Sequence, residues 1–113
     1  MNYNKYGNHK CELDGYKFDS KKEMERYAQL KLEVKNGDIK DLELQPRFTL
    51  LEAGTNHMGK KYRKIEYVAD FKYYDVKEQL WCVEDVKGMK TDVYKIKVKL
   101  FWSMFPHYYF QEL

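Results

Sequence analysis

The sequence predicts a mixed α/β fold of the α+β type, in which two helices flank a small mixed β-sheet and an N-terminal hairpin precedes them. Three patterns indicate this fold: short segments of alternating apolar and polar residues, two stretches with apolar residues at helical spacing, and turn residues between them. A chain of 113 residues suits one compact domain with a modest core. We therefore expect a single domain over residues 1–113, with the polar segment 1–10 poorly ordered.

Local signals define the individual elements. Asp14-Gly15 suits the left-handed positions of a type I′ turn between two short strands. Ser20 is a helix N-cap, and Pro46 restricts Gln45 to extended geometry and divides an extended region in two. In chain order, the expected hairpin, first helix, extended region, long strand, second strand, second helix and final strand cover residues 11–18, 20–36, 39–53, 61–75, 79–87, 91–105 and 107–112.

Composition excludes several classes of protein. Charged residues make up 35% of the chain, and no apolar run approaches the ~20 residues that a membrane helix needs. The N-terminus has no apolar stretch typical of a signal peptide, so we expect a cytoplasmic protein without a membrane partner. The net charge of +3 favours a polyanionic partner only weakly. Cys11 and Cys82 are not arranged for a zinc site, and Cys82 is expected in the core.

Two acids and a lysine are expected to meet at one end of the sheet. Side chains along a strand alternate between two faces, which puts Asp70 on the more polar face of its strand. In the next strand Asp85 and Lys87 share one face, and Glu84 points the opposite way. If the two strands pair, the carboxylates and the ammonium group converge, as in a metal site with a built-in cation.

Glu23 is an anomaly of the first helix. At 100° per residue it falls inside the apolar stripe, between Leu30 and Val34, whereas Arg26 falls on the polar side. A buried carboxylate is costly unless it is paired or binds a metal. Glu23 also stands three residues after Ser20, which is the spacing of a capping box. Both a capping role and a role in a metal site are therefore open.

The second helix contains a similar anomaly. Thr91 or Asp92 caps this helix and Pro106 ends it. Lys97 lies in the middle of its apolar face, where it either extends to solvent or faces the acidic site or a phosphate. That face is expected to comprise Val93, Tyr94, Leu100, Phe101 and Met104.

Asp70, Asp85-Val86-Lys87 and an inward Glu23 together resemble the PD-(D/E)XK nuclease superfamily, in which an acid on one strand precedes (D/E)-x-K on the next. Ala69 stands where the usual motif has proline. Longer segments resemble a small family of phage and prophage endonucleases. This family is commonly catalogued as a domain of unknown function and is grouped with Holliday-junction-resolvase-like nucleases. These segments are residues 14–23, 44–46, 67–71, 83–88 and 90–91.

This resemblance implies a restriction-endonuclease-like core and Mg²⁺- or Mn²⁺-dependent cleavage of DNA. It implies that Asp70 and Asp85 bind one or two metal ions, with the Val86 carbonyl as a further ligand. Glu23 would complete the shell directly or through water. Lys87 would orient the attacking water or stabilise the transition state.

Other candidates are secondary. Gln45 matches a family position near the site, although a glutamine before proline is as often a plain loop residue. DNA contact requires positive charge outside the acidic centre, and the basic segment after the Gly54–Gly59 loop is either such a surface or an exposed hairpin edge. The candidates for DNA contact are Lys60, Lys61, Arg63, Lys64 and Lys90, with Lys95 and Lys99 weaker.

Three functions remain open at this point: a metal-dependent endodeoxyribonuclease, which would include a branched-DNA resolvase; a catalytically silent DNA-binding or phage accessory module on the same fold; and an unrelated α+β binding domain whose acids form surface salt bridges. The set of Asp70, Asp85 and Lys87 favours the first, because clustered acids repel phosphate in a module that only binds. Symmetric cleavage of two strands would favour a homodimer.

Overall fold

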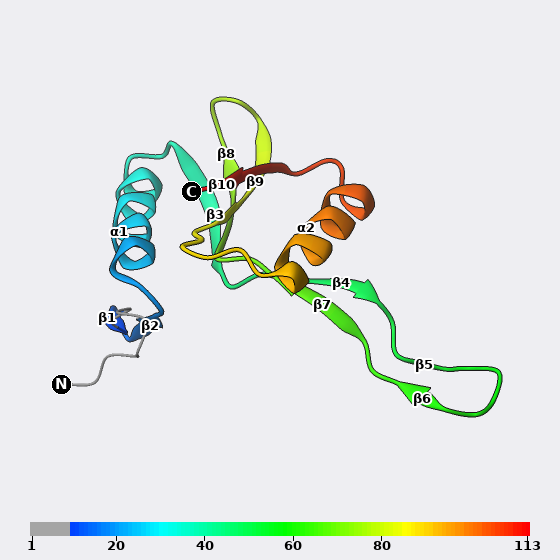
Figure 1. The fold of residues 1–113 in the computed structure, drawn as a ribbon. Helices are drawn as coiled ribbons and strands as arrows, with labels where there is room; N and C mark the ends of the chain where they lie inside the picture. The colour runs from blue at the N-terminus through cyan, green and yellow to red at the C-terminus, as the bar shows by residue number, and fades with distance from the viewer. Residues whose placement is uncertain (1–9) are drawn as a thin grey trace.

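The computed structural model describes residues 10–113, so nearly all of the segment expected to be poorly ordered, residues 1–9, lies outside the described residues. The α+β class is confirmed, with two helices and a mixed sheet (Figure 1). No described helix has the length and apolar character needed to span a membrane. The elements are β1 Cys11–Leu13, β2 Tyr16–Phe18, α1 Lys21–Lys35, β3 Ile39–Leu44, β4 Arg47–Leu51, β5 Gly54–Thr55, β6 Lys61–Tyr62, β7 Ile65–Val68, β8 Phe71–Asp75, β9 Leu80–Asp85, α2 Asp92–Met104 and β10 Tyr109–Glu112.

The four-stranded sheet separates two hydrophobic clusters. Its strand order is β10-β9-β8-β3, with β10 parallel to β9 and the other pairs antiparallel. Cys82 packs in the cluster beneath α1, which includes Tyr27 and Leu30. Its neighbour Val83 packs in the cluster beneath α2, which includes Phe101. The two helices therefore cover opposite faces of β9, as alternation along a strand requires.

The strand expected over residues 61–75 is not continuous. It is interrupted at Ala69 and Asp70, and its first part pairs with β4 outside the four-stranded sheet. The interruption lies opposite Gln45-Pro46, where the partner strand breaks as predicted. Hydrogen bonds from Gln45 N–H to Asp70 O (2.9 Å) and from Ala69 N–H to Pro46 O (3.1 Å) join the two breaks. Both strands therefore leave the sheet together as an arm that ends in β5 and β6 (Figure 1).

Gln45 does not have the extended geometry that a following proline favours. Its φ is 52°, in the left-handed region that is costly for a residue with a side chain. The hydrogen bond of its N–H to Asp70 O and the pairing on either side hold it there. A local preference was overridden by the bend of the two paired strands.

The N-terminal hairpin and both helix caps are confirmed. Asp14 and Gly15 have φ values of 56° and 82°, as a type I′ turn needs. Ser20 accepts a hydrogen bond from the Glu23 N–H at 3.2 Å, and Thr91 caps α2 in the same way. The hairpin packs on α1, with the rings of Phe18 and Tyr27 5.2 Å apart.

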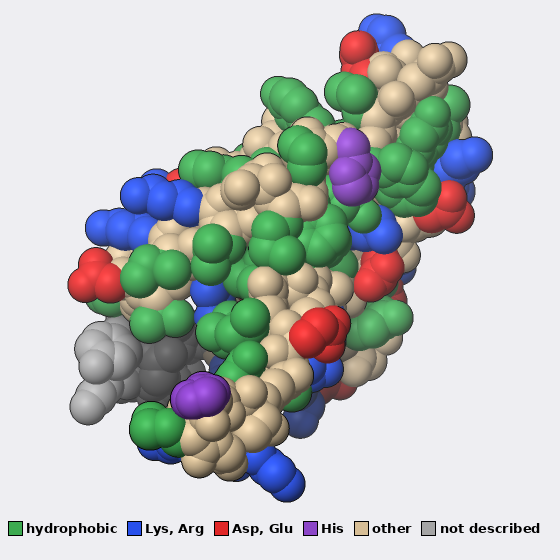
Figure 2. Space-filling model, turned by 90° about the vertical axis from the view of Figure 1, so that its right-hand side faces the viewer, with side chains coloured by type: hydrophobic (Ala, Val, Ile, Leu, Met, Phe, Trp, Pro, Cys, Tyr) green, Lys and Arg blue, Asp and Glu red, His purple; other side chains and the backbone are tan. Residues whose placement is uncertain are grey.

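The apolar face expected for the second helix was partly wrong. The buried side chains of α2 are Tyr94, Val98 and Phe101, and Lys97 is only partly exposed beside them. The prediction merged this face with a second apolar stripe, which stays exposed on the side of the molecule viewed in Figure 2. On α1, Val34 is likewise exposed rather than buried. The exposed stripe of α2 comprises Val93, Ile96, Leu100 and Met104.

Candidate acidic site at the bend of the sheet

The bend places Asp70 against the end of β9. Asp70 lies in the interruption between β7 and β8, and its N–H donates a hydrogen bond to Glu84 O at 3.0 Å. Its Oδ2 accepts a hydrogen bond from the Val86 N–H at 2.6 Å. The carboxylate thus lies across the point where β9 ends, next to Asp85. The predicted convergence of these two strands is realised through the bend rather than along a straight ladder.

Asp85 is fully buried and only half satisfied. Its Oδ2 accepts a hydrogen bond from the Tyr67 hydroxyl group. Its Oδ1 lies 3.2 Å from Lys87 Nζ, but this nitrogen is not aligned to donate a hydrogen bond. Among residues 10–113, Asp85 Oδ1 is the one buried side-chain nitrogen or oxygen atom without a hydrogen-bond partner. Such an atom is costly unless something else binds it.

Lys87 and Lys90 belong to the segment that follows β9. The Lys87 ammonium lies 4.8 Å from the centre of the Tyr94 ring, and the backbone N–H of Lys87 donates a hydrogen bond to Leu113 O. The Tyr94 hydroxyl group donates to Glu112, which also pairs with Lys90. The end of the chain therefore holds this segment in place, and Lys90 is engaged in a structural ion pair.

Glu23 is buried on α1, as the stripe argument predicted. Its N–H completes the cap with Ser20, while its carboxylate accepts a hydrogen bond from the Asp19 backbone. The same carboxylate is close enough to Asp85 and Lys87 to interact with their charges. The backbone N–H of Glu23 therefore takes part in the cap while its side chain faces the acids, and its role in a metal site stays a prediction.

The acids raise one another's pKa values. Burial raises the pKa of Asp70 to about 8, helped by the charges of Asp85 and Glu23 and opposed by the hydrogen bond from the Val86 N–H. Burial, with the charges of Asp19 and Asp85, raises the pKa of Glu23 to about 7, and Lys87 opposes it. Carboxylates with raised pKa values in a cleft are typical of functional sites and of sites for cations.

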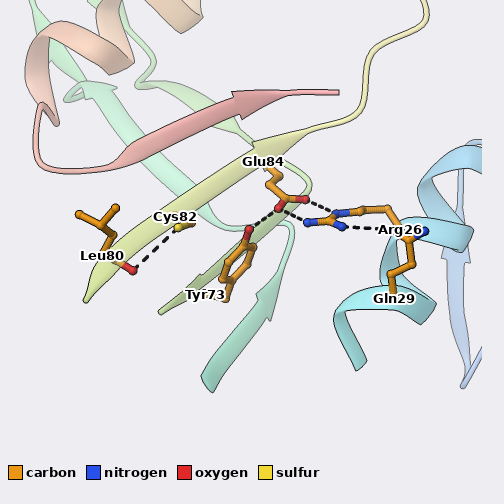
Figure 3. Close-up of polar contacts among 6 residues, drawn as sticks. All are labelled: Arg26, Gln29, Tyr73, Leu80, Cys82 and Glu84. Atoms are coloured by element: carbon orange, nitrogen blue, oxygen red, sulfur yellow. Dashed lines mark hydrogen bonds and ion pairs between the residues drawn. The ribbon is translucent and has the colours of Figure 1, made fainter. Parts of the chain in front are cut away.

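Glu84 points away from this site, as predicted, and enters a second network that the sequence did not predict. The Arg26 guanidinium binds the buried Glu84 carboxylate with two hydrogen bonds, of 2.7 and 2.6 Å (Figure 3). The Tyr73 hydroxyl group donates to the same carboxylate, and Gln29 accepts from Arg26 at 3.1 Å. The available signal was that Glu84 shares one face of the strand with the apolar Leu80 and Cys82, since a charge on such a face requires a partner.

Two clefts meet at Glu23 and Asp70. One encloses about 420 Å³ and runs past Lys87 to Gly88. The other encloses about 230 Å³ and extends toward the β1–β2 hairpin, and Gln45 lines it. The acids are therefore accessible from outside although Asp85 itself is buried.

The remaining candidates lie apart from the acids. The basic residues of the loop region are exposed on or beside β6, far from α1 (Figure 1). Lys64 Nζ lies 3.4 Å from Glu66. Lys97 forms no hydrogen bond or ion pair with any residue in the described range, so the structure does not bring it to the acidic site. The exposed basic residues are Lys60, Lys61, Arg63 and Lys64.

The donor set fits a divalent cation held by two carboxylates. Within residues 10–113, no three His, Cys, Asp or Glu side chains are grouped closely enough to hold a metal ion. Glu23 is therefore not a third direct ligand in this conformation, and its action through water stays a prediction. Asp70 and Asp85 supply hard oxygen atoms, and the Oδ1 atom of Asp85 has no hydrogen-bond partner. Mg²⁺ typically uses one or two carboxylates together with water and substrate phosphates.

The fold and site define a small α+β domain with a buried aspartate, Asp85, beside the partly buried Asp70 and an adjacent lysine. The chain belongs to the family described as "Protein of unknown function (DUF1064)", whose model matches residues 3–111. No curated protein and no solved structure matches the chain.

Proposed function

We propose that this protein is a metal-dependent endodeoxyribonuclease with Asp70 and Asp85 at its centre. The observation that carries the proposal is the fully buried Asp85, whose Oδ1 lacks a hydrogen-bond partner beside the raised-pKa carboxyl of Asp70 and the ammonium of Lys87. A purely structural acid would pair both of its oxygens, as Glu84 does. The sequence order of these residues supports a relationship to the PD-(D/E)XK nucleases with a restriction-endonuclease-like core.

The residues divide the chemistry among them. Bound Mg²⁺ would acidify a water molecule and offset charge on the scissile phosphate. Asp70 and Asp85 would hold the ion, with the Val86 carbonyl as a further donor. Lys87 lies beside Asp85, where its fixed positive charge stabilises charge that builds up on the phosphate. Glu23 accepts a proton from, or orients, a water molecule in the cleft that it lines.

DNA binding requires contacts beyond the acids. The basic arm residues, Lys60 to Lys64 around β6, supply exposed positive charge at the end of the molecule. Contacts of this kind bind phosphates without reading sequence. Under this proposal the protein acts in the cytoplasm on phage or host DNA, and a second copy completes symmetric cleavage.

A catalytically silent DNA-binding module on the same fold is the alternative. The site weighs against it because a module that only binds DNA has no need for a cluster of acids around the fully buried Asp85, one oxygen of which lacks a hydrogen-bond partner. The burial of Asp85 argues against the third possibility, an unrelated domain whose acids form surface salt bridges.

Cleavage of plasmid and four-way-junction DNA, with Mg²⁺ or with EDTA, tests the proposal. We expect the wild type to cut only with Mg²⁺, and both Asp85→Ala and Asp85→Asn to be inactive. Glu43→Gln is a matched control, since Glu43 is an exposed acid of β3 whose carboxylate lies 4.0 Å from Lys72. Absence of metal-dependent cutting by the wild type would refute the enzyme. Full activity of Asp85→Asn would refute the assigned site.

A further inference from the structure

The smaller of the two clefts has no part in the chemistry proposed above. It encloses about 230 Å³ between the β1–β2 hairpin and the bend of the sheet. Glu23 and Asp70 line it and also line the cleft over Lys87. A group bound there lies directly beside the acid that would hold the metal ion. We call this space the hairpin cleft, and its other lining residues used below are Tyr16, Lys17 and Gln45.

Tyr16 provides an aromatic surface in the hairpin cleft. Its side chain is 48% exposed, although its ring is held by an edge contact with Tyr27 at 5.6 Å. Tyr27 is in turn fixed by the hydrogen bond of its hydroxyl group to Asp14 (3.0 Å). An ordered and exposed aromatic ring offers a surface on which a flat, apolar group can stack.

Gln45 provides hydrogen-bonding groups at a fixed position. Its side chain is exposed and forms no hydrogen bond with any other described residue. Its backbone is held at a φ of 52° by the hydrogen bond to Asp70 O. A non-glycine residue rarely adopts such a conformation, and residues that do so concentrate at binding sites. The free amide offers two donors and one acceptor.

The lining side chains decide what kind of group fits, because the hairpin cleft combines carboxyl groups, an amide and an aromatic ring. A neutral planar group with donors and acceptors at its edge fits the aromatic ring and the amide together. A nucleobase has these properties, and glutamine is a common partner of adenine. Lys17 lies on the exposed hairpin, where its ammonium can bind the phosphate attached to that base.

We propose that the hairpin cleft binds an unpaired nucleobase next to the scissile phosphate. The substrate is then DNA with an unpaired nucleotide at a branch, flap or bulge rather than a continuous duplex. This inference rests on the proposed nuclease function, since it names the substrate of that same site. In a continuous duplex the base is stacked and paired, so it must leave the stack and its partner before it can enter the cleft.

A duplex that carries one unpaired 2-aminopurine tests the inference, because the fluorescence of this base falls when it stacks on an aromatic ring. Binding is measured with Ca²⁺ in place of Mg²⁺, and the comparison ligands are the same bulge with an abasic nucleotide and the fully paired duplex. Tyr16→Leu removes the ring, Tyr16→Phe keeps it, and Gln45→Leu removes the amide. Tyr109→Leu is the matched control, because Tyr109 is an exposed tyrosine of β10 outside both clefts.

We expect the wild type to quench the unpaired base and to bind it about 10-fold more tightly than the abasic bulge, since stacking contributes about 1–3 kcal/mol per base. Tyr16→Leu should abolish the quenching and this preference, and Tyr16→Phe and Tyr109→Leu should keep both. Gln45→Leu should weaken only binding of the base-containing bulge.

Equal binding of the bulge with and without its base, or quenching that survives in Tyr16→Leu, would overturn the inference. The two proposals fail separately. Mg²⁺-dependent cleavage without quenching would refute the hairpin cleft alone. Quenching and preference without any cleavage would refute the nuclease and leave the base-binding site.

Discussion

Asp85 and Glu84 are adjacent and equally buried, but only Glu84 has hydrogen bonds to both of its carboxylate oxygens. Glu84 is matched by the guanidinium of Arg26 and the hydroxyl group of Tyr73. Asp85 has one oxygen bonded to Tyr67 and one without a hydrogen bond. Burial of a charge has the same cost in both residues, so the difference indicates different purposes. Glu84 holds α1 to the sheet, and under the proposed function Asp85 binds the metal ion.

The Tyr67 hydroxyl group fixes the Asp85 carboxylate, so its removal tests the metal site without changing an acid. We expect Tyr67→Phe to weaken Mn²⁺ binding about 10–100-fold, because groups that orient metal ligands typically contribute this much. Calorimetric titration of Mn²⁺ measures it. Tyr73→Phe is the matched control, since its hydroxyl group bonds Glu84 instead. Equal weakening by both variants would contradict the assignment of the metal to Asp85.

The raised pKa values predict how the metal-free protein responds to pH. Glu23 and Asp70 have folded pKa values of about 7 and about 8, above the ordinary values of 4.5 and 3.8. The folded state therefore binds protons more tightly than the unfolded state does, and these groups favour folding most below about pH 4. Their contribution is lost as the pH rises from about 4 to 8.

We expect the melting temperature in EDTA to fall over this pH range and the fall to be smaller in Asp70→Asn. Mg²⁺ should raise the melting temperature more at pH 8 than at pH 5, because the ion binds the deprotonated acids. Differential scanning fluorimetry at both pH values measures these effects. A melting temperature that depends on pH equally in wild type and Asp70→Asn would contradict the coupling of these acids.

At the scale of elements, α1 both anchors itself to the sheet and presents Glu23 to the acids. Arg26 binds Glu84 on the sheet, and Glu23, three residues earlier, faces the acids. The ion pair therefore sets the position of the helix that holds Glu23. Bidentate pairing of this kind restricts both distance and rotation.

Removing one partner of this pair leaves a buried charge. We expect Arg26→Met to lower the free energy of unfolding by about 3–5 kcal/mol, and the double variant Arg26→Met/Glu84→Leu to recover much of it. Urea unfolding measures both. Lys21→Ala is the control, because its exposed pair with Glu25, 3.9 Å apart, contributes at most about 1 kcal/mol. A double variant as unstable as Arg26→Met would show that the charge is not the cause.

Local sequence patterns were sufficient for most elements but not for the bend. The cap at Ser20, the Asp14-Gly15 turn and the final strand follow from neighbours in the sequence. The bend at Asp70 does not, because buried and exposed residues still alternate through it. It depends on pairing with the break at Gln45-Pro46, which only the register between distant strands reveals.

The site shows the same division. The orientations of Asp70, Asp85 and Glu84 follow from strand alternation. The partnership of Arg26 with Glu84 joins residues 58 positions apart, and Arg26 had been placed on the polar side of its helix. The apolar face of α2 was predicted only in part because this helix has two apolar stripes, and periodicity alone does not tell which one meets the core.

At the scale of the whole molecule, the break between β7 and β8 that contains Asp70 lies between α1 and the far end of the arm, which is formed by β5 and β6 (Figure 1). Under the proposed function, we expect DNA that reaches the acids to be attracted by the basic residues of the arm. Each phosphate that the arm neutralises changes the slope of log K for DNA binding against log salt concentration by about 0.9.

We expect the variant with alanine at Lys60, Lys61, Arg63 and Lys64 to bind DNA more weakly and with a salt dependence smaller by about 2–4. Fluorescence anisotropy at several salt concentrations measures this slope. Lys35→Ala, at the exposed end of α1, is the control for a general loss of charge. An unchanged slope in the arm variant would exclude the arm as the DNA-binding surface.

The central claim is that Asp70 and Asp85 form a metal-dependent centre for DNA cleavage. The rate of cleavage of a branched DNA, measured against Mg²⁺ concentration for wild type and Asp85→Asn at equal folded concentration, tests it most directly. The account predicts a rate that saturates with Mg²⁺ in the wild type and at least about a 100-fold lower rate in the variant at every concentration. Cleavage that persists in EDTA, or a variant as fast as the wild type, would contradict it.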